Sequence, residues 1–101
     1  MTENPTVIQI HGIVIDPMKW EVLAEGIPIP LTSDQFRLLR FLASNAGLVF
    51  TRQQIIEAVH KPNHPVTERS VDFQMMEIRR KLGNLGTLIQ TVRGVGFRFR
   101  A

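Results

Sequence analysis

The first third of the chain consists of short apolar runs separated by residues that favour tight turns. The runs, most of them rich in β-branched side chains, occupy residues 7–10, 13–15, 20–23 and 27–31. The turn signals between them are His11-Gly12, residues 16–19 and Glu25-Gly26. Runs this short with such close connections predict a four-stranded antiparallel sheet. Pro28 and Pro30 place the last run at a sheet edge, because an edge strand needs fewer backbone N–H donors.

Apolar positions take helical spacing from residue 32 onward. Thr32-x-x-Gln35 and Thr51-x-x-Gln54 are capping boxes, each placed before an apolar segment with that spacing. The first box predicts a helix that is buried on more than one face and stops near Gly47. The second opens a shorter helix, after a strand-like run at residues 48–50. Two prolines predict a loop at residues 60–65.

A third helix is predicted from near Thr67 to Leu82, with Gly83 as its stop. At 100° per residue, four apolar side chains fall within about 40° of one line along this helix: Val71, Met75, Ile78 and Leu82. This stripe predicts the face that packs on the core. The opposite side carries two cations, Arg69 and Arg80, and two large apolar side chains, Phe73 and Met76. Glu77 lies beside them.

The last segment has the pattern of a β-hairpin. Residues 87–92 and 97–100 read as strands, joined by a turn at residues 93–96 whose glycines permit positive φ. Phenylalanines alternate with arginines in the second strand, so one face packs on the core and the other is basic. Gly94-x-Gly96 could also be read as a phosphate-cradling loop, but neither a Lys-Ser/Thr pair nor a helix follows it.

These elements together predict the α+β class. The architecture is a winged helix-turn-helix with an N-terminal four-stranded antiparallel sheet, three helices and a C-terminal β-hairpin wing. The 101 residues fit one such domain at residues 7–101, preceded by a linker or disordered N-terminus at residues 1–6.

Composition argues against an enzyme. The absence of cysteine removes disulfides, thiolate metal sites and thiol nucleophiles. The three histidines, His11, His60 and His64, have no carboxylate cluster to complete a metal site. We therefore predict no catalytic residue, no metal and no cofactor. No apolar run approaches the roughly 18 residues of a membrane span, and the first residues lack a signal pattern, so we expect a cytoplasmic protein without a membrane partner.

Charge is divided unevenly along the chain. Residues 1–68 hold five basic and seven acidic side chains, whereas residues 69–101 hold seven basic and two acidic ones. A basic C-terminal third on a mildly acidic body predicts a surface that faces a polyanion, although a solvated basic face is the simpler alternative.

The mixed side of the third helix narrows this prediction to double-stranded DNA. The major groove admits an α-helix, offers thymine methyl groups to apolar side chains and exposes phosphates to arginines. Arg93, at a glycine-flanked hairpin tip, suits the minor groove. Alternatively, Phe73 and Met76 pack against the body or a second copy, or dock a partner protein in an interaction module without DNA binding. RNA is a weaker alternative, because a folded wing and a groove-reading helix suit the B-form duplex better.

The chain resembles the C-terminal winged-helix effector domains of OmpR/PhoB-type response regulators. The matching segments span roughly residues 8–100: Leu31-Thr32, Phe36-x-Leu38-Leu39, residues 45–52, Arg69-Ser70-Val71-Asp72, residues 78–83 and residues 89–99. The most specific of them is Thr91-Val92-Arg93-Gly94-x-Gly96-Phe97.

The resemblance implies sequence-specific DNA binding for transcription regulation, as the output domain of a two-component phosphorelay. Recognition helix 67–82 would lie in the major groove and wing 91–97 in the minor groove. The implied phosphate contacts come from Arg52, Arg69, Arg79 and Thr91, and Arg93 would enter the minor groove. The implied base-facing positions are Ser70, Phe73, Met76 and Glu77.

Further expectations concern charge and partners. The run Arg79-Arg80-Lys81 complements the helix dipole, and the same charges can reach a phosphate. Glu77 could accept a hydrogen bond from cytosine N4 or repel phosphate. The resemblance further implies an N-terminal receiver domain, RNA polymerase contact through the loop from His60 to Val66, and a head-to-tail dimer on DNA.

Overall fold

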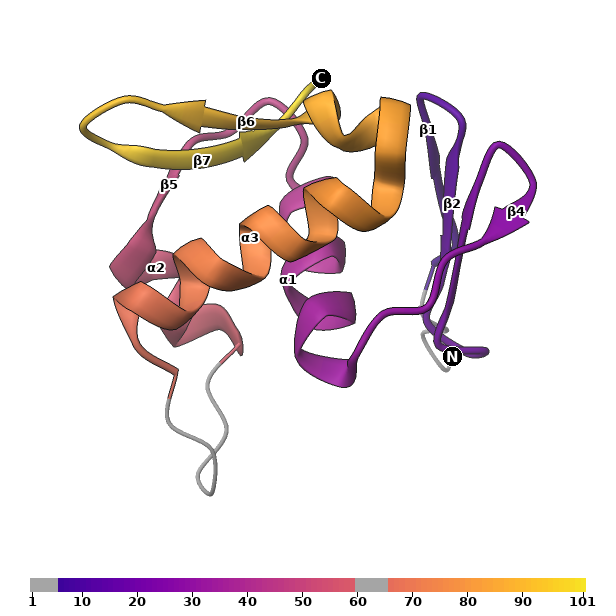
Figure 1. The fold of residues 1–101 in the computed structure, drawn as a ribbon, viewed down its shortest axis with the longest axis horizontal. Helices are drawn as coiled ribbons and strands as arrows, with labels where there is room; N and C mark the ends of the chain where they lie inside the picture. The colour runs from indigo at the N-terminus through magenta and orange to yellow at the C-terminus, as the bar shows by residue number, and fades with distance from the viewer. Residues whose placement is uncertain (1–5, 60–65) are drawn as a thin grey trace, which may run out of the picture.

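The computed structural model describes residues 6–59 and 66–101 of the chain. In chain order the elements are β1 (Ile8–Ile10), β2 (Ile13–Asp16), β3 (Glu21–Ala24), β4 (Ile27–Pro28), α1 (Ser33–Ser44), β5 (Phe50–Thr51), α2 (Arg52–Val59), α3 (Glu68–Leu82), the 3-10 helix η1 (Gly83–Leu88), β6 (Ile89–Val92) and β7 (Gly96–Phe99). This order confirms the predicted α+β winged helix-turn-helix (Figure 1). The predicted linker at residues 1–6 lies almost entirely, and the predicted loop at residues 60–65 entirely, outside the described residues.

The N-terminal sheet has the strand order β1-β2-β3-β4, and all neighbouring pairs are antiparallel. The register sets two buried pairs on its inner face: Ile13 opposite Ala24 and Ile15 opposite Val22. β4 covers only Ile27–Pro28 and is shorter than the predicted run. The prolines at positions 28 and 30 explain this, because neither can donate an N–H to the ladder.

Both predicted capping boxes are formed. At the start of α1, the Gln35 N–H donates to Thr32 Oγ1 at 3.2 Å and the Thr32 N–H donates to Gln35 Oε1 at 3.1 Å. Thr51 and Gln54 repeat the exchange at the start of α2, at 2.9 and 3.1 Å. α1 ends at Ser44, before the predicted stop at Gly47, because the N–H of Asn45 caps the Leu42 carbonyl.

The C-terminal hairpin belongs to a three-stranded sheet with the order β5-β7-β6. The strand-like run predicted at residues 48–50 is β5, displaced to Phe50–Thr51, and its pairing with β7 was not predicted. Gly96 makes this pairing possible: a Cβ there would lie 1.9 Å from the Phe50 carbonyl oxygen. The first wing strand begins at Ile89 instead of residue 87, because η1 occupies the preceding residues.

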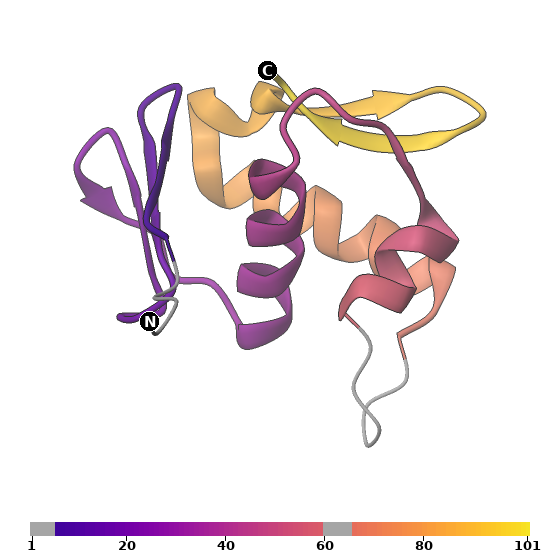
Figure 2. The same ribbon diagram turned by 180° about the vertical axis from the view of Figure 1, so that it is seen from behind.

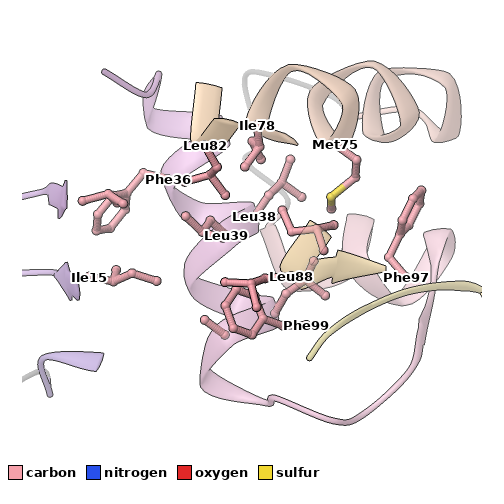
Figure 3. Packing of buried hydrophobic residues seen from close by; sticks show 14 of the residues in the cluster. Ile15, Phe36, Leu38, Leu39, Met75, Ile78, Leu82, Leu88, Phe97 and Phe99 are labelled. Carbon is pink, nitrogen blue, oxygen red and sulfur yellow. The ribbon is translucent and has the colours of Figure 1, made fainter. Parts of the chain in front are cut away.

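The core lies between the two sheets and the helices. Figure 2 shows the N-terminal sheet on one side of α1 and the wing sheet across one end of the helices. Side chains from α1, α3 and the wing meet in this core, where Leu39, Met75, Ile78 and Phe99 are fully buried (Figure 3). The core packs against one face of α3 and one face of the wing, and the other face of each lies on the surface of the molecule.

Candidate nucleic-acid interface

α3 is divided into a buried stripe and an exposed stripe, as its periodicity predicts. Val71, Met75 and Ile78 have no exposed surface and Leu82 is 4% exposed. Met75, Ile78 and Leu82 point from α3 toward the core (Figure 3). On the opposite side, Phe73 is 54% and Met76 58% exposed. The alternative in which these two side chains pack against the body is therefore wrong.

The helix is held at both ends by local interactions. Thr67 Oγ1 accepts a hydrogen bond from the Ser70 N–H at 3.1 Å, which caps the N-terminus. Gly83 ends α3 with a φ of +59°, a left-handed conformation that glycine adopts without steric cost. Arg69 is exposed and Ser70 half-buried in the first turns. The N-terminal end of α3 and the hairpin tip extend toward the same side of the molecule (Figures 1 and 2).

The basic run near the end of α3 divides into three separate sets of contacts. Arg79 Nε donates to the Ile89 carbonyl at 3.0 Å, and its Nη2 donates to Thr91 Oγ1 at 2.6 Å. Arg80 pairs with Glu77, with Nη2 and Oε1 2.8 Å apart. Lys81 Nζ donates to Gln35 Oε1 at 2.7 Å. Adjacent cations thus join α3 to the wing, to its own exposed face and to α1.

The contacts that Arg79 makes within the protein were not predicted from the sequence. Burial lowers the pKa of its guanidinium, which nevertheless stays protonated at neutral pH. The group also lies over the Phe97 ring, 5.7 Å from its centroid. Arg79 therefore braces α3 against β6 and β7. Its predicted phosphate contact, and that of Thr91, stay predictions.

Arg52 extends this brace to the second helix. Its Nε donates to the carboxylate of Asp72, which joins the start of α2 to α3. Its guanidinium lies 5.0 Å from the centroid of Phe97, whose side chain is buried. Two guanidinium groups therefore lie over the Phe97 ring, one from each helix of the helix-turn-helix unit. We call Arg52, Asp72, Arg79, Thr91 and Phe97 the hub.

The hub could not be found from local patterns. Arg52 and Asp72 are 20 residues apart, and Arg79 and Thr91 are 12 apart. Alternation in the last strand did predict that Phe97 packs inward. What the pattern lacked was the identity of the groups that cover the ring. The structure brings three predicted site residues, Arg52, Arg79 and Thr91, together at this hub.

Glu77 and Arg80 form a charge pair on the exposed side of α3. The hydrogen bond from Arg80 lowers the pKa of Glu77, and the bond to Glu77 raises the pKa of Arg80. Both groups are therefore charged at neutral pH, and the Glu77 carboxylate already accepts two hydrogen bonds from Arg80. The pair leaves little net charge beside Met76.

The hairpin tip presents Arg93 to solvent. The Val95 N–H donates to the Val92 carbonyl at 2.9 Å, and Gly94 has a φ of +77°. Arg93 and Val95 are both exposed. The tip is therefore a tight turn with an outward arginine, as its sequence predicts.

Other kinds of site were sought in the same structure. Among the described residues there is no group of three or more His, Cys, Asp or Glu side chains that could hold a metal ion. In residues 6–59 and 66–101, no helix has the length and apolar character needed to cross a bilayer.

Comparison with known proteins identifies relatives along almost the whole chain. A family model described as "Transcriptional regulatory protein, C terminal" matches residues 26–99. The transcriptional regulatory protein VxrB of Vibrio cholerae is 44% identical over 99 residues, which are 98% of this chain and 40% of VxrB. The phosphate regulon transcriptional regulatory protein PhoB of Pseudomonas aeruginosa is 36% identical over 93 residues, which cover 91% of this chain and 41% of PhoB. The chain spans about two-fifths of the length of these relatives.

Solved structures agree with these relatives. The Klebsiella pneumoniae RstA DNA-binding domain, in complex with the RstA box, has a TM-score of 0.81 and 29% identity, covering 95% of this chain and 98% of that one. Response regulator DrrB of Thermotoga maritima, an OmpR/PhoB homolog, has a TM-score of 0.81 and 32% identity, covering 94% of this chain and 44% of that one. The matching family model describes a transcriptional regulator and not an enzyme. The chain belongs to the OmpR/PhoB family, as a C-terminal winged-helix domain of a transcriptional regulatory protein.

Proposed function

We propose that this chain is the DNA-binding output domain of a two-component response regulator, which binds double-stranded DNA at specific sequences to regulate transcription. The observation that carries the proposal is the composition of the exposed side of α3. It presents Phe73 and Met76 between Arg69 and Arg80, while the opposite stripe is buried. Two of the similar structures, RstA with the RstA box and AdeR with an intercistronic region, are DNA-binding domains in complexes.

The proposed binding mode uses two elements. Residues 67–82 enter the major groove, and the wing at residues 91–97 lies in the adjacent minor groove with Arg93 inserted. Arg69 and Arg80 are exposed and suited to phosphates. Ser70, Phe73, Met76 and Glu77 face base edges. Arg52, Arg79 and Thr91 hold the wing relative to α3 and reach phosphate from the hub.

The proposed partners follow from family membership and length. The relatives are more than twice as long as this chain, which leaves room for the receiver domain that response regulators carry. RNA polymerase contact through the loop from His60 to Val66 is proposed on the basis of family membership, and residues 60–65 of that loop lie outside the described range. A head-to-tail dimer on direct repeats is proposed on the same family basis. Binding to chromosomal DNA would place the protein in the cytoplasm.

Salt dependence tests the proposed function. If about six phosphates are contacted, log affinity for a selected duplex should fall with log salt at a slope of about −5. Arg93→Ala should weaken duplex binding because the minor-groove contact is lost, while the melting temperature stays nearly unchanged. Arg40→Ala removes one positive charge from α1, outside the proposed recognition surface, so it is the matched control and should bind like the wild type.

The opposite result would favour the alternative function. A flat salt response together with tight binding of a partner protein would identify a protein-interaction module. Unaltered duplex binding by Arg93→Ala would remove the wing tip from the proposed mode.

A further inference from the structure

Phe73 and Met76 form an apolar pair at the centre of the proposed recognition surface. They are three residues apart on α3, so their Cβ atoms are neighbours on the helix surface at about 5–6 Å. More than half of each side chain is exposed. Exposed arginines lie on the same side of the helix on both flanks, at positions 69 and 80. Phe73 and Met76 therefore form an exposed apolar patch, with Arg69 on one flank and the Arg80–Glu77 ion pair on the other.

The polar side chain that follows this patch in sequence is already engaged. Glu77 follows Met76 directly, and its carboxylate accepts hydrogen bonds from Arg80 at 2.8 and 3.4 Å. A paired carboxylate has less capacity to accept from cytosine N4 than a free one. The middle of α3 consequently offers apolar surface, and few free polar groups, to a base edge.

Only one base edge in the major groove carries an apolar group. Guanine, cytosine and adenine present donors and acceptors there, whereas thymine adds its C5 methyl group. We propose that Phe73 and Met76 determine specificity by packing on thymine methyl groups, so that the half-site carries thymines under the middle of α3. This inference rests on the proposed function and adds the chemical group that the recognition helix reads.

The expected effect can be given in advance. Burying one methyl-sized apolar group contributes roughly 0.8 kcal/mol, which corresponds to about fourfold in affinity. Each thymine that meets the patch should contribute about that factor through its methyl group alone. Thymine hydrogen bonds are left intact when the methyl is removed, so deoxyuridine isolates the methyl term.

The experiment begins with duplex selection from randomised DNA, and each thymine of the selected half-site is then replaced by deoxyuridine. Dissociation constants are measured by fluorescence anisotropy for the wild type, Phe73→Ala, Met76→Ala and the double variant. The wild type should lose about fourfold at one or two positions. Each single variant should lose the sensitivity at one of them, and the double variant at both.

Met18→Ala is the matched control. Met18 is 69% exposed and lies in the turn between β2 and β3, so its truncation should leave every deoxyuridine effect intact. Circular dichroism melting of each variant checks that the fold is retained, which the exposure of both side chains predicts.

The outcomes separate this inference from the proposed function. Salt-dependent duplex binding that is indifferent to every deoxyuridine overturns methyl reading and leaves DNA binding in place. A selected half-site without thymine, or deoxyuridine sensitivity that survives in the double variant, overturns it too. Failure to bind any duplex at low salt rejects the proposed function itself.

Discussion

The two sides of α3 differ in what they contact, although each carries a methionine. Met75 is fully buried among α1 and the wing residues, and its neighbour Met76 is 58% exposed. The same residue type packs in the core at one position and lies on the surface at the next. Successive residues of a helix are rotated by about 100° around its axis, so neighbouring side chains of α3 point to different faces. This angle decides whether a side chain packs in the core or faces solvent.

The largest expected effect comes from exchanging Met75 for alanine, with the same exchange at Met76 as its comparison. Met75→Ala should lower the free energy of unfolding by about 2–5 kcal/mol, because it leaves a cavity in a close-packed core. Met76→Ala should change it by less than about 0.5 kcal/mol, since that residue is 58% exposed to solvent. Urea unfolding followed by circular dichroism measures both. A destabilisation of similar size in the two variants would contradict the division of α3 into faces.

A second pair of neighbouring residues, Arg79 and Arg80, tests the contacts that hold α3 against the wing. Arg79→Lys should cost about 1–2 kcal/mol of stability, because one ammonium cannot bridge the Ile89 carbonyl and Thr91 Oγ1 and cover Phe97 at once. Duplex affinity should fall with it, since the wing loses its brace. Arg80→Lys is the control, and its melting curve should overlay that of the wild type. If the two lysine variants melt alike, the hub does not fix the wing.

Sequence patterns predicted the parts of this molecule that depend on local interactions. The capping boxes and the glycine turn at the hairpin tip each involve residues within about one turn of chain, and the stripe of Val71, Met75, Ile78 and Leu82 lies within a single helix. Their energetics are set by helix and turn geometry, which recurs in every protein.

Contacts between different segments of the chain were not predicted, because local sequence patterns do not show which segments meet in the folded protein. Gly86 is needed for close packing, because a Cβ there would lie 2.4 Å from the Arg79 carbonyl oxygen. The Arg52–Asp72 pair and the β5–β7 pairing likewise join segments whose proximity only the folded core creates. The roles of the site residues on the exposed side of α3 are still predictions, since their partner is outside the chain.

The smallest expected effect concerns Glu77 and Arg80, on the exposed side. The pKa of Glu77 is lowered in the folded state by its hydrogen bond to Arg80, from an ordinary value of 4.5. The folded protein therefore binds this proton less readily than the unfolded chain does. The stabilisation is complete above pH 4.5 and is lost as the pH falls through the lower, folded value. Glu77→Gln, which keeps the shape and removes the charge, should be slightly less stable than the wild type at pH 7.

Urea unfolding of both proteins at pH 7, 5, 4 and 3 follows the difference in stability between them. The difference should be constant between pH 7 and 5 and should shrink below pH 4.5, where Glu77 of the unfolded wild-type chain becomes protonated before that of the folded protein. Added salt at pH 7 should also reduce it, because the pair is exposed and ions screen it. A difference that grows on acidification, or that ignores salt, would mean that Glu77 acts through packing. The exposed side would then share the energetics of the buried one.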